Sequence, residues 1–277
     1  LETKDLSLKD TVLLVRIRKD LEELLEVLKK QQAYTKFLDE VYERELKVKV
    51  RDDVLVEFIG YVDKIMMYKR VSDTFFTIID YKTGNPNLNL NNVIYGIEMQ
   101  LPVYIYLTRN NPKFNKITVA GFYLQKILNN EIKADGKNSY ESLKKKNLLL
   151  QGYSNENTEI LEYFDDSYAD SLVVKSLKQT SKGFSSYSKV LDNKTITELT
   201  DLTEEKIKKS TNDILDAKFD INPKRIGIEN LGCEFCNFKD ICFKTEKDIV
   251  NLREYKNLEF LGGEDDGMDS GTGRSDS

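Results

Sequence analysis

Two charged side chains close a strongly apolar segment of this sequence. Asp80 and Lys82 follow the run Phe75-Phe76-Thr77-Ile78-Ile79. Residues two apart on a strand point to the same face of a sheet, so the carboxylate and the ammonium are expected to lie side by side. Charges at the end of such a run are costly unless a partner neutralises them. The pair is therefore a candidate for a functional site in which charge is neutralised, such as the site of a metal-dependent hydrolysis.

The residues around this pair predict two strands joined by a hairpin. Segments 54–68 and 75–80 are rich in β-branched and aromatic residues, which favours strands. The polar residues 69–74 are expected to form the loop between them. A turn centred between Val71 and Ser72 then fixes which residues face each other.

With that turn, Asp63 faces Asp80 across the antiparallel pair. Two facing carboxylates repel unless a cation lies between them, and oxygen ligands with retained waters suit Mg²⁺. A neighbouring Lys82 can then stabilise a hydroxide or the charge that develops on phosphorus. The spacing also fits a purely structural role, in which Asp63 and Lys82 are edge-strand charges and Asp80 caps a loop. A slip of one residue would move Asp63 to the other face.

A second pair of polar residues follows on an expected helix. Gln100 and Tyr104 are four positions apart within 94–107, so they share one helix face. The alternative for both is a half-buried face of the core. Gly-x-x-Asp, Asp-x-Lys and Gln-x-x-x-Tyr in this order are more specific together than apart. They stand here as Gly60…Asp63, Asp80-Tyr81-Lys82 and Gln100…Tyr104.

This ordered set resembles the RecB-type branch of the PD-(D/E)xK nuclease superfamily, to which the AddB-like nucleases belong. The resemblance implies that Asp63 and Asp80 bind a catalytic Mg²⁺ (or Mn²⁺) and that Lys82 assists the attacking water. It also implies that Gln100 and Tyr104 support the site or touch DNA.

All three cysteines of the chain lie close together, at Cys233, Cys236 and Cys242. Three thiolates within ten residues, interleaved with aromatic side chains, are typical of metal ligands. Zinc with a fourth ligand from elsewhere and an iron–sulfur cluster both fit, and inert buried thiols are the remaining alternative. The odd number argues against a disulfide framework and favours a reducing cytoplasm.

The cysteine motif 233–242 extends the resemblance. In AddB-like nucleases, and in CRISPR adaptation nucleases, a similar trio joins a distant N-terminal Cys on a four-iron four-sulfur cluster that staples the two ends of the domain. The long interval between Tyr104 and Cys233 favours the AddB-like group. No Cys precedes Cys233, and the helix-borne His of the family is missing too. Both are expected on a preceding segment of a longer polypeptide, because the chain starts at Leu1 without a Met.

Other segments complete the expected fold. Residues 11–39 have the apolar spacing of one or two amphipathic helices, and 46–50 alternate like a strand. The almost continuous apolarity of 117–128 suits a strand buried on both faces. Between 129 and 221 the pattern is weak, with one expected helix at 204–215.

These elements, with the resemblance, imply an α/β restriction-endonuclease-like fold. A mixed central sheet flanked by helices is closed by the C-terminal cysteine staple. Residues 1–262 are expected to form one nuclease domain, truncated at its N-terminus. Residues 263–277 are acidic, almost lack apolar side chains and are expected to be disordered.

Composition excludes several other classes. The chain has no His, which removes Ser-His-Asp and Cys-His catalysis and most zinc hydrolase designs. It has no apolar run of the ~20 residues that a membrane helix needs, and no secretory signal. No phosphate loop of a nucleotide-driven motor occurs. The net charge of −5 neither supports nor excludes binding to DNA, because contact with DNA needs local rather than global positive charge.

The sequence therefore predicts a Mg²⁺-dependent DNA nuclease of the cytoplasm. By resemblance it is a single-strand exonuclease that works with an AddA-like helicase subunit in double-strand break repair and recombination. A non-catalytic structural or DNA-guiding module is the alternative from another class, and the missing His keeps it open. A stand-alone phage or CRISPR-associated exonuclease is the third possibility.

Overall fold

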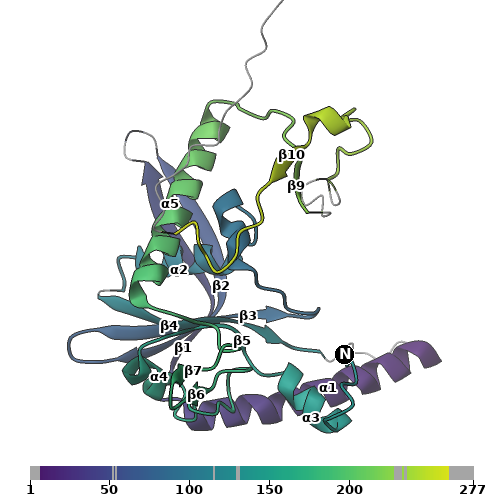
Figure 1. Cartoon of the computed structure of the whole chain (residues 1–277), viewed down its shortest axis with the longest axis vertical. Helices are drawn as coiled ribbons and strands as arrows, with labels where there is room; N and C mark the ends of the chain where they lie inside the picture. The colour runs from purple at the N-terminus through teal and green to yellow at the C-terminus, as the bar shows by residue number, and fades with distance from the viewer. Residues whose placement is uncertain are drawn as a thin grey trace, which may run out of the picture. The chain divides into compact units, whose positions relative to one another are not determined.

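A mixed sheet dominates the larger of two compact units of the chain (Figure 1). The computed structural model describes residues 7–51, 53, 55–114, 116–128, 132–227, 233 and 236–261. Within them, six strands follow the order β1-β2-β3-β4-β5-β8. β3 runs parallel to β4 and β5 to β8, whereas the other neighbours are antiparallel. The strands are β1 (Asp39–Arg51), β2 (Val56–Lys69), β3 (Thr74–Lys82), β4 (Ile117–Lys126), β5 (Gln151–Asn155) and β8 (Val190–Leu191). The expected α/β class with a mixed central sheet is confirmed.

Of the described residues, the larger unit comprises those within 7–88 and 99–201, and the smaller one those within 89–98 and 202–261. Among the described residues, the helices are α1 (Leu8–Tyr34), η1 (Leu90–Tyr95), α2 (Gln100–Arg109), α3 (Tyr140–Asn147), α4 (Thr158–Phe164), α5 (Asn193–Leu215) and η2 (Glu246–Asp248). Two small sheets pair β6 (Gln179–Thr180) with β7 (Gly183–Phe184), and β9 (Lys224–Ile226) with β10 (Val250–Leu252). None of the described helices is both long and apolar enough to cross a bilayer.

The β2–β3 hairpin has the register that the sequence predicts. The ladder runs from Lys69↔Thr74 to Lys64↔Ile79, so the next step would set Asp63 against Asp80. The turn is closed where the Arg70 N–H donates to the Asp73 carbonyl at 2.8 Å.

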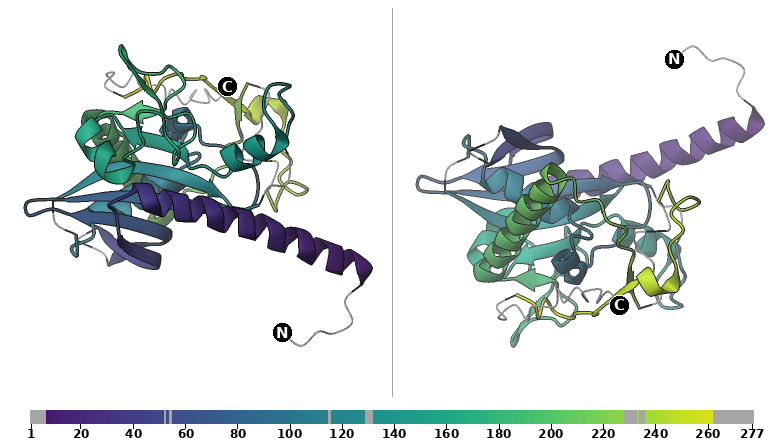
Figure 2. Two further views of the ribbon diagram at one scale, coloured as in Figure 1. Left: turned by 90° about the horizontal axis from the view of Figure 1, so that it is seen from below. Right: turned by 90° about the horizontal axis from the view of Figure 1, so that it is seen from above.

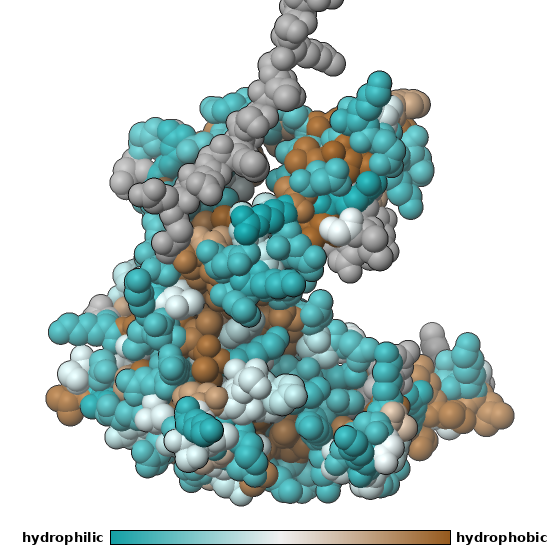
Figure 3. Space-filling view, viewed as in Figure 1, coloured by the Kyte–Doolittle hydropathy of each residue, from teal (hydrophilic) through white to brown (hydrophobic). Residues whose placement is uncertain are grey.

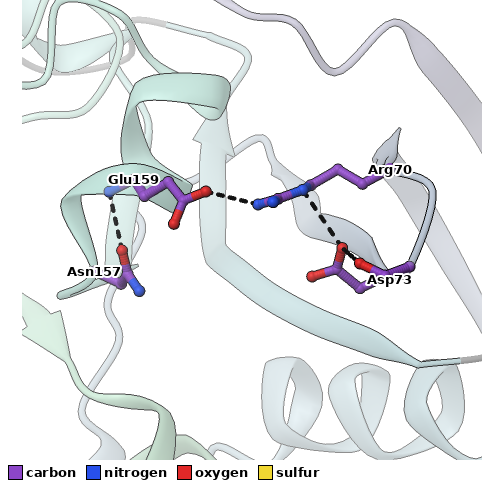
Figure 4. A network of polar contacts seen from close by, with 5 residues as sticks. Arg70, Asp73, Asn157 and Glu159 are labelled. Carbon is purple, nitrogen blue, oxygen red and sulfur yellow. Dashed lines mark hydrogen bonds and ion pairs between the residues drawn. The ribbon is translucent and has the colours of Figure 1, made fainter.

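A polar network ties this turn to helix α4 (Figure 4). Arg70 Nη1 lies 2.7 Å from Glu159 Oε1, and Arg70 Nε lies 3.5 Å from Asp73 Oδ1. At the start of α4, the Glu159 N–H donates to Asn157 Oδ1 at 2.9 Å. Partly exposed ion pairs contribute little to stability, so we assign this network to orientation of the hairpin rather than to its strength.

Helices cover both faces of the sheet. α2 contacts β1, β2, β3 and β4 on the face that carries Asp80. Successive strand residues alternate in direction, so Ile79 points to the opposite face. There it joins a buried cluster with Tyr123 and with Phe164 of α4, whose rings stack with centroids 5.4 Å apart. β4 is buried from Val119 to Lys126, as expected for a strand covered on both faces.

Helix α1 packs only with its C-terminal half. Leu24 and Val27 are buried against Leu148, whereas Leu8 and Val15 are 81% and 65% exposed. Figure 2 shows the N-terminal half extending past the sheet, and Figure 3 shows apolar residues gathered at its outer end. The single helix ends at Tyr34, and β1 starts at Asp39 inside the segment predicted to be helical.

Two predicted helices have different starts in the structure. The helix expected from 94 begins at Gln100, because Gly96 and Glu98 adopt left-handed backbone angles with φ of 74° and 57°. A short 3₁₀ turn, η1, precedes them. The helix expected at 204–215 begins earlier, at Asn193. Short elements between 129 and 191, including β5 and α4, were not predicted.

The smaller unit joins η1 to the C-terminal segment. The Tyr95 hydroxyl donates to the Arg253 carbonyl at 2.9 Å, and the Leu258 N–H donates to Asn91 Oδ1 at 2.9 Å. β9 and β10 pair in parallel through Lys224↔Val250. The tail 263–277, expected to be disordered, lies outside the described residues.

Gly60 allows α2 to approach β2, and this contact generates a stability prediction. A Cβ on Gly60 would lie 2.5 Å from Leu107 Cδ1 of α2, a side chain that is fully buried. Gly60→Ala should therefore lower the free energy of unfolding by about 1–3 kcal/mol, the usual cost of overpacking a core. Urea unfolding of the variant and the native chain measures this difference in free energy.

Gly84→Ala is the matched control, because a Cβ there meets nothing within 4 Å. The Gly60 and Leu107 effects should also be coupled, since Leu107→Ala removes the clashing group. An unfolding midpoint of Gly60→Ala equal to that of Gly84→Ala would contradict this account of the glycine.

Candidate active site

Asp80, Lys82 and Gln100 form one hydrogen-bonded group at the end of β3. Lys82 Nζ lies 2.6 Å from Asp80 Oδ2 and donates to Gln100 Oε1 at 2.6 Å. Gln100 Nε2 donates to Asp80 Oδ1 at 2.6 Å. β3 supplies the first two residues and the first turn of α2 supplies the third, so the group forms only when α2 packs on the sheet.

Asp63 joins this group through the backbone of β3. Its Oδ2 accepts a hydrogen bond of 2.9 Å from the Tyr81 N–H. The β2–β3 ladder ends one step earlier, at Lys64↔Ile79. The Asp63 carboxylate therefore satisfies a strand N–H beyond the last paired residues, and its negative charge acts on Asp80. The structure thus brings together the two acidic residues that the sequence singled out.

Burial controls the electrostatics of Asp80, whose side chain is 1% exposed. Burial raises the pKa of Asp80 above the ordinary carboxyl value of 3.8, and the nearby charge of Asp63 raises it further. Lys82 and Gln100 act in the opposite direction, since they stabilise the charged form, but they do not reverse the shift. The ionised pair of carboxylates is held together at a cost in free energy.

The oxygen of Asp80 that faces Lys82 suits a cation. Asp80 Oδ2 is buried and makes no hydrogen bond of normal geometry; its contact is the ion pair with Lys82. Among the described residues, no group of three or more Asp, Glu or Cys side chains is placed to hold a metal. A cation here would therefore take two carboxylates and complete its shell with water or substrate oxygens, which is how Mg²⁺ usually binds.

Tyr104 lies beside Gln100, as the four-residue spacing predicts. Gln100 Nε2 lies 3.0 Å from the Tyr104 hydroxyl, to which it donates. Burial raises the pKa of Tyr104, and the charges of Asp80 and Asp63 raise it as well. The phenol thus stays protonated and can donate a hydrogen bond toward the carboxylates or a substrate.

Glu43 of β1 is a further acidic residue that sequence reasoning missed. It lies between the pairs Tyr42↔Lys64 and Arg44↔Val62, and therefore opposite Asp63. Its backbone is left-handed, with φ of 44°, and its charge acts on Tyr104. The sequence offers no way to choose Glu43, because β1 carries three glutamates, at positions 40, 43 and 45.

The cysteine segment forms successive tight turns in the smaller unit. The Cys236 N–H donates to the Cys233 carbonyl at 3.4 Å, and the Lys239 N–H donates to the Cys236 carbonyl at 3.3 Å. All three thiols are partly exposed. Within the part of the chain that the structure describes, the trio is not gathered into a metal-binding group.

Comparison with known sequences defines the class to which this site belongs. Residues 3–243 match the PD-(D/E)XK nuclease superfamily, so the chain belongs to that superfamily. A central mixed sheet with two carboxylates and a lysine at one edge is consistent with this fold.

Three of the relatives that this chain resembles are named as the B subunit of an ATP-dependent helicase/deoxyribonuclease. The chain is 28% identical over 274 residues to this protein from Staphylococcus saprophyticus, covering 88% of this chain and 23% of that protein. The relative from Thermoanaerobacter sp. is 26% identical over 72% of this chain and 18% of its own length. The relative from Bacillus mycoides is 25% identical, with 76% and 20% covered. The chain thus spans about a fifth of the length of these relatives.

The raised pKa of Asp80 predicts that its charge destabilises the fold. The pKa of Asp80 in the folded chain lies above the ordinary 3.8. The folded chain therefore loses stability as the pH rises from 3.8 through the folded pKa. Asp80→Asn lacks this titration. Its free energy of unfolding relative to the native sequence should increase as the pH rises above 3.8, and should level off once the pH exceeds the folded pKa of Asp80.

Thermal unfolding over a pH series without divalent cations measures this difference. Glu162→Gln, at an exposed position on α4, is the control and should follow the native profile. A constant difference between Asp80→Asn and the native chain over the whole series would contradict the role given to burial.

Proposed function

We propose that this chain hydrolyses phosphodiester bonds of DNA with a Mg²⁺ or Mn²⁺ ion held by Asp63 and Asp80. The observation that carries the proposal is the buried Asp80 carboxylate, with Asp63 and Lys82 beside it at the end of β3. Membership of the PD-(D/E)XK nuclease superfamily supports the reaction class.

Each residue has a separate task in this proposal. Asp63 and Asp80 would hold the metal, which would supply a Lewis acid for the phosphodiester when bound. Lys82 is placed to stabilise the attacking hydroxide or the charge on the phosphate, because its ammonium lies 2.6 Å from the proposed ligand Asp80. Gln100 orients both groups through its 2.6 Å contacts, and Tyr104 supports Gln100.

We further propose single-stranded DNA as substrate, exonucleolytic cleavage and a helicase subunit as partner. The relatives are named as helicase/deoxyribonuclease subunits, and these names support DNA and a helicase. Double-strand break repair is the process that such an assembly would serve. A non-catalytic module is less favoured because the carboxylates and the lysine are brought together.

Removing either proposed metal ligand should abolish cleavage. Asp80→Ala and Asp63→Ala are each expected to lower the rate by at least about a thousandfold, since metal-based charge stabilisation supplies several kcal/mol. Release of nucleotides from a labelled single strand in Mg²⁺ or Mn²⁺ measures the rate. Glu162→Ala removes an exposed carboxylate and should cleave normally.

Unchanged cleavage by Asp80→Ala, in a protein that keeps its secondary structure, would defeat the assignment. Loss of activity in only one of the two aspartate variants would mean that the carboxylates do not act together.

Lys82→Ala should affect the chemical step more than metal binding. The ammonium is assigned to the water or the transition state, so turnover at saturating metal should fall by about a hundredfold or more, while half-saturation in metal changes little. Lys82→Arg should not restore full activity, because the guanidinium is larger, planar and differently hydrated.

Single-turnover rates over a Mn²⁺ series separate the two effects, with Lys113→Ala, at an exposed position, as the charge control. A Lys82→Ala protein that binds metal weakly but turns over normally at saturation would overturn this role.

For the cysteines we propose a four-iron four-sulfur cluster whose fourth thiolate comes from outside this sequence. The turns at Cys233 and Cys236 support a ligand segment, whereas three thiolates alone do not close a cubane. No step of the hydrolysis depends on this group.

This arrangement predicts the colour of the purified chain. Three thiolates would leave such a cluster one protein ligand short, so the chain alone should be colourless or should bleach quickly in air. A longer polypeptide that supplies a fourth Cys should absorb stably in the visible range and melt at a higher temperature, because the cluster closes a long loop.

Metal analysis and visible spectra of both proteins provide the measurement. Stoichiometric zinc instead of iron, or a longer protein that stays colourless and gains no stability, would contradict the cluster. The nuclease proposal does not depend on either result.

A further inference from the structure

The carboxyl end of β4 brings a buried cation next to the Asp80–Lys82 group. Lys82 pairs with Lys126 in the parallel β3–β4 ladder, and the Ile127 N–H donates to the Lys82 carbonyl at 2.9 Å. Lys126 is only 2% exposed, and its Nζ donates to Asn85 Oδ1 at 2.6 Å. In open α/β sheets, ligands bind outside the carboxyl ends of parallel strands. Lys126 therefore extends the candidate active site along this edge.

Two more lysines reach the same edge from segments far apart in the sequence. β5 runs antiparallel to β4, with Gln151 opposite Leu124, so Leu150 lies near the end of β4. The Lys175 N–H donates to the Leu150 carbonyl at 2.8 Å, which places Lys175 there too. Lys146, in the last turn of α3, precedes Asn147. The Asn147 Oδ1 accepts a bond of 3.4 Å from Lys175 Nζ.

The electrostatics of Lys175 show that these charges repel one another. Burial lowers the pKa of Lys175, and the positive charges of Lys146 and Lys126 lower it further. Lys144, on the same helix as Lys146, shows the contrasting structural case. Burial lowers the pKa of Lys144, but its ammonium lies 2.6 Å from Glu23, and this contact together with the charges of Glu23 and Asp20 raises the pKa overall. Cations gathered close together destabilise one another, and a bound anion relieves that repulsion.

We propose that Lys126, Lys146 and Lys175 bind a phosphate of the DNA strand, one position removed from the phosphodiester that is cleaved. The inference rests on the proposed nuclease function and names a second contact with its substrate. Phosphate contacts of this kind fix the position of a strand without reading its sequence. The amides of Asn85 and Asn147, which already contact Lys126 and Lys175, can turn to donate to phosphate oxygens.

Binding of a fluorescent oligothymidylate in the presence of EDTA tests the site without cleavage. Lys146→Gln with Lys175→Gln should weaken binding by about tenfold at low salt, and the slope of log K against log salt should fall by roughly 0.7 for each phosphate contact that is removed. Lys113→Gln with Lys145→Gln is the matched control, because it also removes two positive charges, both from exposed positions. Equal affinity and slope for the double variant and this control would overturn the proposal.

A stability measurement separates anion binding from a structural role of Lys175. Lys175→Met removes a repelled, half-buried charge, so its melting temperature should equal or exceed that of the native chain. Inorganic phosphate should raise the melting temperature of the native chain more than that of Lys175→Met. A lower melting temperature for Lys175→Met, with the same response to phosphate as the native chain, would overturn the proposal.

Cleavage assays keep this inference distinct from the proposed function. A substrate with one phosphodiester, such as the nitrophenyl ester of thymidine monophosphate, cannot reach the second site. The double variant should cleave it at the native rate while it cleaves the oligonucleotide more slowly. If the double variant lost the same fraction of its cleavage rate on both substrates, the proposal of a second site separate from the cleavage site would be overturned. A native chain that cleaves neither substrate would sink the nuclease proposal, and the EDTA binding result would still decide whether the lysines bind the strand.

Discussion

The burial of the Asp80 carboxylate is the constraint on which the candidate active site depends. Its side chain is 1% exposed, and Asp63 adds a second negative charge, so both effects raise its pKa. Lys82 from β3 and Gln100 from α2 offset part of this cost through contacts of 2.6 Å. These partners come from two elements, so the charge is tolerated only when helix and sheet are packed together. A divalent cation is the partner that best suits two such carboxylates.

The backbone around the site departs from regular strand geometry at several positions next to Asp63 and α2. The β2–β3 ladder ends before Asp63, and its carboxylate accepts the Tyr81 N–H instead. Opposite Asp63, Glu43 adopts a left-handed conformation within β1. Gly60 leaves room for Leu107 of α2, the helix that carries Gln100. Natural proteins concentrate such local departures at functional sites, where surrounding packing maintains them.

The sequence was informative where the structure depends on local patterns. Period-two alternation and a polar turn predicted the β2–β3 register, and the four-residue spacing predicted the contact of Gln100 with Tyr104. The start of α2 was misplaced because the left-handed Gly96 and Glu98 interrupt an apolar pattern that continues through them. Short elements such as β5 and α4 carry too few residues for a periodic signal. The approach of Lys175 to Lys126 depends on pairing between distant segments, which no local pattern records.

Direct binding of Mn²⁺ tests the central claim, that Asp63 and Asp80 are held together as a metal site. Electron paramagnetic resonance of free Mn²⁺ reports how much of the ion each protein binds, without any need for cleavage. We predict a specific Mn²⁺ site in the native chain that weakens by at least about tenfold in Asp63→Asn and in Asp80→Asn, because each removes one of two charged ligands. Glu162→Gln should bind as the native chain does. Equal Mn²⁺ affinity in the native chain and in both aspartate variants would contradict the account.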